Sequence, residues 1–140
     1  MKSIVLIALL TLTCQLSFSQ VHWLINADSI PDCEFIKSGK FLNKESNEVA
    51  TPGYYIVFED GYATEYLNDG QYYLKSKIEF LTDCSYESTV VEVTMPNSTI
   101  EVGTVIYTEI IETALIDNLV QLKSDHDGEV YYFVFEKVDG

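Results

Sequence analysis

The chain has 140 residues, and its 8 basic and 22 acidic side chains give a formal net charge of −14; every basic residue is lysine. This length fits one domain with a modest core and excludes two. Proteins that bind nucleic acid or anionic membranes present basic patches, so we exclude both as direct partners of this acidic chain. A hydrophobic fraction of 47% also excludes a disordered acidic tail.

The first residues have the order of a secretory signal. One lysine is followed by an apolar run over 4–12, and Ser17 and Ser19 are the small residues that a signal peptidase reads. The run is too short to cross a bilayer, which takes about 20 apolar residues, and no later segment comes near that length. We therefore expect a signal peptide over 1–19 and a single secreted or periplasmic domain over 20–140, with no transmembrane segment.

The three cysteines bear on export in two ways. Lipidation of Cys14 is an alternative to cleavage, but such signals place Gly, Ala or Ser directly before the cysteine and Leu three residues before it. This chain has Thr13 and Thr11 there, so the cleavable signal is preferred. Cleavage leaves Cys33 and Cys84, and an even pair in an exported protein predicts a disulfide. A pair of buried free thiols is the alternative.

Residues that favour strands dominate the mature chain. Val, Ile and Thr supply 31 residues from position 20 onward, and the chain has ten Tyr. No stretch has the apolar recurrence and the capping residues of a helix. The segment 20–32 is ambiguous, and 44–53 is expected to be a polar loop. Strands are expected over 40–43, 54–59, 62–67, 71–82, 86–95, 103–113, 119–123 and 129–138.

Turn residues separate these segments. Asp60-Gly61 and Asp69-Gly70 are typical of tight hairpin turns, and 125–128 is expected to form another. The alternation of apolar and polar residues slips near Val90, as a β-bulge would cause.

Short antiparallel strands in sequential hairpins predict an all-β meander of seven or eight strands. Such a meander closes into a barrel or folds into two packed sheets, because open sheet edges invite aggregation. An up-and-down, lipocalin-like barrel is preferred, and a two-sheet sandwich is the second choice.

Motifs for catalysis, metals and cofactors are missing from the sequence. His22 and His126 are the only histidines, and neither lies in a motif with a nucleophile. There is no Gly-x-Ser-x-Gly, no zinc-ligand spacing and no phosphate-binding loop. The segment 125–129 resembles the start of a calcium loop but is interpreted as an acidic hairpin turn. We expect no catalytic residue, no metal site and no cofactor.

Pairs of adjacent tyrosines put one ring on each face of a strand. Ordinary strand packing explains them, and that reading is favoured. The functional alternative is a ligand cavity or binding surface lined by amphipathic rings. The candidate lining residues are Tyr54, Ile56, Phe58, Tyr72, Leu74, Ile78 and Phe80.

Four segments resemble a group of small secreted proteins of Bacteroidota. They are Cys33-Glu34-Phe35, Gly39-Lys40-Phe41, Thr64-Glu65-Tyr66 and the stretch from Lys77 to Tyr86, which contains Asp83-Cys84-Ser85-Tyr86. The resemblance implies that Cys33 and Cys84 belong to the framework of the fold. No biochemical function is established for that group, so the resemblance implies no functional residue.

The sequence therefore predicts an exported, non-catalytic binding module. Its partner would be a small apolar or amphipathic ligand inside the barrel, or a protein on its rim. The alternative is a structural or interaction protein of the envelope without a ligand. A small hydrolase that uses scattered carboxylates is the least favoured reading.

Overall fold

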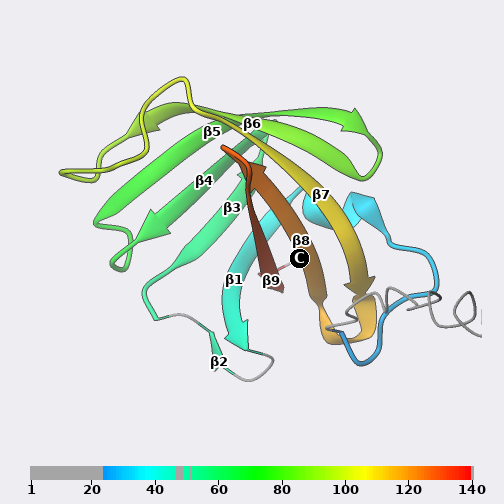
Figure 1. Cartoon of the computed structure of the whole chain (residues 1–140). Helices are drawn as coiled ribbons and strands as arrows, with labels where there is room; N and C mark the ends of the chain where they lie inside the picture. The colour runs from blue at the N-terminus through cyan, green and yellow to red at the C-terminus, as the bar shows by residue number, and fades with distance from the viewer. Residues whose placement is uncertain (1–23, 47–48, 51, 140) are drawn as a thin grey trace, which may run out of the picture.

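The computed structural model describes residues 24–46, 49–50 and 52–139. Within them the chain forms a closed antiparallel up-and-down barrel of eight strands, as Figure 1 shows. The preferred fold is thus confirmed. The strands of the barrel are β1 (Gly39–Ser46), β3 (Tyr55–Glu59), β4 (Tyr62–Leu67), β5 (Tyr72–Thr82), β6 (Ser85–Val93), β7 (Val105–Ala114), β8 (Leu119–His126) and β9 (Glu129–Asp139). The two-residue strand β2 (Val49–Ala50) pairs only with β1.

The barrel closes because β1 pairs on both sides. Residues 39–41 pair with β3, and residues 40–44 pair with β9, where Phe41 lies opposite Lys137 and Lys44 opposite Val134. β1 continues past the expected strand over 40–43, because Lys44 pairs with Val134 on β9 and Ser46 pairs with Val49 on β2. The expected loop over 44–53 is wrong at 44–46 and 49–50, because the polar composition that predicts a loop does not indicate these backbone pairings.

Turns and bulges follow the sequence pattern. Asp60-Gly61 and Asp127-Gly128 both have positive φ at their two residues, which matches the twist of the strands they join. Val91 has no partner between the pairs Ser76–Val90 and Lys75–Glu92, so the predicted bulge is confirmed. A second bulge at Ile111, between the pairs Ile110–Leu122 and Glu112–Gln121, was not predicted.

A short 3-10 helix, η1 (Cys33–Ile36), closes one end of the barrel. Asp32 caps it by accepting a hydrogen bond from the Glu34 amide at 3.1 Å. Ile36 is fully buried in the core. The predicted disulfide between Cys33 and Cys84 is present, with the two Cα atoms 5.2 Å apart, and it ties η1 to the connection between β5 and β6.

Aromatic rings fill this closed end. The rings of Phe35 and Phe41 meet edge to face at 5.7 Å, and those of Phe41 and Phe58 do so at 5.6 Å. Lys137 donates a hydrogen bond to the carbonyl oxygen of Phe35 at 3.1 Å, and its ammonium lies 4.9 Å from the Phe35 ring centroid. This end of the barrel is packed solid.

The segment before η1 lies along the outside of the barrel. Leu24 packs with Ala114 and Val134, and its amide donates to the Glu112 carboxylate at 3.1 Å. The Asp28 carboxylate accepts a hydrogen bond from the Thr113 hydroxyl at 2.6 Å. Residues 24–32 form no strand, so the described part of the ambiguous segment does not join the sheet. The expected signal peptide lies outside the described residues.

In the described part of the chain, no helix is long and apolar enough to span a membrane.

Removal of the disulfide should destabilise the barrel strongly. The bridge joins positions 51 residues apart, and the loss of such a cross-link costs about 4 kcal/mol in the chain-entropy account. We expect the double variant C33S/C84S to melt roughly 15 °C below the native protein. Thermal melting followed by circular dichroism, with and without a reducing agent, checks this. A reductant should lower the melting temperature of the native protein and leave that of the variant unchanged; equal melting temperatures without reductant would contradict the prediction.

Candidate functional site

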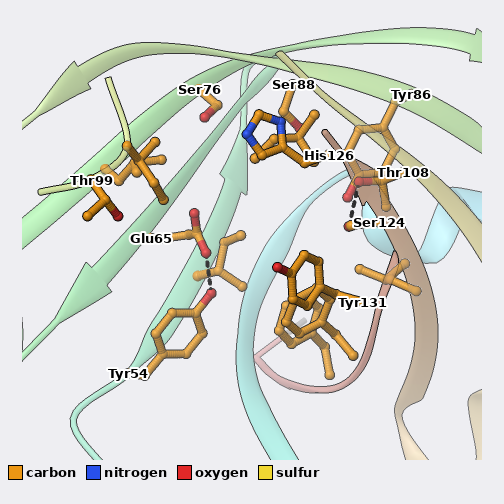
Figure 2. A pocket seen from close by; sticks show the side chains of 17 residues that line it. Tyr54, Glu65, Ser76, Tyr86, Ser88, Thr99, Thr108, Ser124, His126 and Tyr131 are labelled. Atoms are coloured by element: carbon orange, nitrogen blue, oxygen red, sulfur yellow. Dashed lines mark hydrogen bonds between the residues drawn. The ribbon is translucent and has the colours of Figure 1, made fainter. Parts of the chain in front are cut away.

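The open end of the barrel contains a cavity of about 430 Å³. Its lining comes from β3 to β9, from Tyr54 just before β3, and from Thr99 and Ile100 in the connection between β6 and β7 (Figure 2). Pockets for small organic ligands have volumes of roughly 300 to 1,000 Å³. The cavity is therefore large enough for one small molecule.

Small side chains at inward positions leave this space unfilled. Ser76 on β5, Ser88 on β6, Thr108 on β7 and Ser124 on β8 all line the cavity. An eight-stranded barrel is just wide enough for larger side chains to fill its interior, as the aromatic rings do at the closed end. The change from rings to hydroxyls along the barrel axis thus creates a hollow at one end only.

The floor and one wall of the cavity are apolar. Four residues belong both to the hydrophobic core and to the cavity lining, and they form its floor: Ile56, Tyr86, Leu122 and Phe135. On β9 the ring of Phe133 stacks with that of Phe135 at 6.1 Å and with that of Tyr131 at 6.5 Å. This row of rings offers a flat apolar surface from the floor to the rim.

Glu65 places a carboxylate on the opposite part of the lining. It pairs with Ile56 on β3 and with Leu74 on β5, and both of these side chains also line the cavity. The Tyr54 hydroxyl donates a hydrogen bond to Glu65 Oε1 at 2.6 Å. Burial raises the pKa of the Glu65 carboxyl, and the hydrogen bond from Tyr54 opposes this only in part.

The pKa values of two tyrosines reflect the same apolar surroundings. Burial raises the pKa of the Tyr54 hydroxyl well above its usual value, and the neighbouring Glu65 raises it further. Burial also raises the pKa of Tyr86, while its hydrogen bond with Thr108 has the opposite effect. Both phenols therefore stay protonated and act as neutral hydrogen-bonding groups.

A second polar group lies across the cavity from Glu65. The hydroxyls of Thr108 and Ser124 are 2.9 Å apart, on the neighbouring strands β7 and β8. In the order of the barrel, β8 lies four strands from β4, so this hydroxyl pair and Glu65 occupy opposite walls. Figure 2 shows the two polar groups separated by the cavity.

The rim carries two partly exposed side chains, His126 and Tyr131. His126 is half-buried at the end of β8, where its Nδ1 lies 3.3 Å from the Val105 carbonyl oxygen and its Nε2 lies 3.2 Å from the Asp127 carboxylate. Tyr131, on β9 of the same hairpin, lies opposite Ser124 and is 47% exposed. The rim therefore leaves the cavity accessible from solvent.

The arrangement is suited to binding. An apolar floor, an aromatic wall, one carboxylate and a few hydroxyls are the usual contents of a ligand pocket. The part of the chain that the structure describes contains no group of three or more His, Cys, Asp or Glu side chains that could hold a metal ion.

The predicted lining residues divide into three groups. Tyr54, Ile56 and Leu74 line the cavity. Phe58, Ile78 and Phe80 belong to the core or pack against it, below the cavity floor. Tyr72 is half-buried, accepts a hydrogen bond from Gln71 at 3.1 Å and does not line the cavity.

The polar residues of the cavity were not among the residues predicted from the sequence. Glu65 follows the buried Ala63 by two positions, so the period of two along β4 places a charged side chain on the inward face. A charged residue at an inward position was thus the sequence signal that could have identified Glu65. The inward serines gave no such signal, because serine occurs on either face of a strand.

Searches against protein-family models, curated proteins and solved structures found no match for this chain.

Replacement of Glu65 should stabilise the empty barrel at neutral pH. A carboxyl whose pKa is raised in the folded state binds its proton more tightly there than in the unfolded chain. Its presence therefore costs stability once the pH rises above the unfolded pKa. We expect E65Q to melt a few degrees above the native protein at pH 7, and the gap to shrink towards pH 4.

Thermal melts at several pH values measure this gap. The matched control is E92Q, because Glu92 accepts a hydrogen bond from Tyr73 at 2.6 Å in the same way but on the exposed surface. The prediction is contradicted if E65Q melts below the native protein at pH 7, or if E65Q and E92Q differ from the native protein by the same amount. Either result would show that burial of the Glu65 carboxyl does not destabilise the barrel.

Proposed function

We propose that this protein is an exported, non-catalytic binding module that holds one small apolar or amphipathic ligand in the open end of its barrel. The cavity itself is the observation that carries the proposal. A core filled by side chains from end to end would have left no room for a ligand, whereas about 430 Å³ lies open here above an apolar floor. The dimensions agree with those of barrels that hold one small molecule.

Export of the protein is part of this proposal. The disulfide supports it, because such bonds persist in oxidising compartments outside the cytoplasm. The resemblance to small secreted proteins of Bacteroidota stays a prediction and agrees with export.

A binding role fits the cavity better than a catalytic one. Hydrolysis of a glycoside uses two carboxyl groups on either side of the scissile bond. Within the described residues the lining contributes one carboxylate, Glu65, and the groups opposite it are hydroxyls.

A surface role without a ligand is the second candidate. Ile25 is 90% exposed and Ile116 is 80% exposed. Their neighbours Asn26 and Asp117 join through a hydrogen bond of 2.9 Å, so the two isoleucines lie in one region of the surface. Exposed apolar side chains in one region can mark contact with another protein.

Filling the cavity should abolish binding of an apolar probe. In S88F the new ring points into the cavity, whereas in T89F it points outward from the same strand, because Thr89 pairs with Lys77 and Val105 on the exposed face. We expect the neutral fluorophore N-phenyl-1-naphthylamine to bind the native protein and T89F alike, and to bind S88F ~10-fold more weakly or not at all. Fluorescence titration measures the affinities, and melting curves confirm that both variants fold.

Equal binding by folded S88F and T89F would show that the probe binds elsewhere and would contradict the cavity as its binding site. If S88F does not fold, S124L tests the same cavity from β8.

A further inference from the structure

The charge inside the cavity bears on the chemistry of the ligand. Within the described residues Glu65 is the only carboxylate of the lining, and the Tyr54 hydroxyl is its only hydrogen-bond partner. An ionised carboxylate accepts about four hydrogen bonds. In Figure 2 one Glu65 oxygen meets Tyr54 and the other points away from it. The site therefore holds an acceptor whose capacity the chain itself uses only in part.

The lysines of the described chain all lie away from the cavity. Lys37 and Lys137 are at the closed end, where their ammonium groups lie over the rings of Phe80 and Phe35. The other described lysines occupy outward strand positions, next to inward-facing neighbours: Lys40, Lys44, Lys75, Lys77 and Lys123. No described lysine neutralises Glu65.

An unpaired carboxylate in an apolar cavity is costly unless something compensates its charge. A ligand with an ammonium group supplies both the missing charge and the hydrogen-bond donors. Such a charge-assisted hydrogen bond is stronger than a neutral one. The cavity would thus gain more from a cationic ligand than from a neutral ligand of the same shape.

The charge of the whole protein acts in the same direction. The net charge of −14 draws cations towards the barrel and repels anions. A fatty acid or another anionic amphiphile would bring a second carboxylate into the cavity with Glu65. Two negative charges in the same cavity repel each other, which opposes binding.

We propose that the cavity selects a small organic cation, a primary or secondary amine on an aromatic or aliphatic body, with its ammonium group on Glu65 and its apolar body against Phe133 and Phe135. This inference rests on the proposed function, because it requires a ligand in the cavity. The hydroxyls of Thr108 and Ser124 are then available to a polar substituent at the far end of the ligand.

Three probes with one apolar body test the inference: 1-naphthylmethylamine, 1-naphthylmethanol and 1-naphthoate, which are cationic, neutral and anionic at pH 7. Isothermal titration measures the affinity of each for the native protein, for E65Q and for the surface control E92Q. We expect the native protein and E92Q to bind the amine at least ~10-fold more tightly than the alcohol, and the naphthoate not measurably. In E65Q the amine should bind no more tightly than the alcohol. The affinity for the alcohol should change by no more than about twofold between E65Q and the native protein, which is small beside the tenfold preference expected for the amine.

A repeat at about 1 M salt separates the cavity from the acidic surface, because surface attraction is largely screened there and a buried pair is screened much less. The amine preference should persist in salt. Binding of all three probes alike, or an amine preference that E65Q retains, would overturn the inference and leave the proposed function standing. If none of the three probes binds, the neutral alcohol included, the cavity is not a ligand site. That result would contradict both the proposed function and the inferred preference for an amine.

Discussion

The ladder between β1 and β9 closes the sheet into a barrel. It joins the first and last strands of the barrel, so no strand of the barrel is left with an open edge. It also sets the register that brings Phe41 opposite Lys137. Lys137 then holds η1 through the carbonyl oxygen of Phe35, and the disulfide holds the same helix from the other side. Closure of the sheet and closure of one end are thus linked through one strand pair.

The interior of a barrel closed in this way can be filled by side chains or left partly empty. At the end beneath η1 the rings of Phe41 and Phe58 fill the space, while at the other end serine and threonine hydroxyls face a hollow. Only the first arrangement contributes the burial of large apolar surface that stabilises a small domain. The second gives up part of that stability, and Glu65 adds the cost of a buried carboxyl with a raised pKa. Such losses are expected where a fold carries a binding site.

How much of this could be predicted from the sequence depends on the range of the interaction. Asp60-Gly61 and the slip near Val90 are local signals, and the turn and the bulge appear where they indicate. The pairing of Lys44 with Val134 on β9 joins residues about ninety positions apart, so no local pattern shows that β1 continues past residue 43. The cavity depends on which inward residues reach the same height in the barrel. That height follows from the register of all eight strands and from the plug formed by η1, and no local sequence pattern indicates either.

If the open end of the barrel holds a small molecule in its natural setting, the protein should carry it through purification. Native mass spectrometry of the protein taken from the exported fraction of its own host can detect such a ligand. We expect a folded protein that carries an extra non-covalent mass, which disappears when the protein is denatured. A folded protein that carries no extra mass, and that takes up no small molecule from an extract of its host, would contradict the claim and favour the surface role.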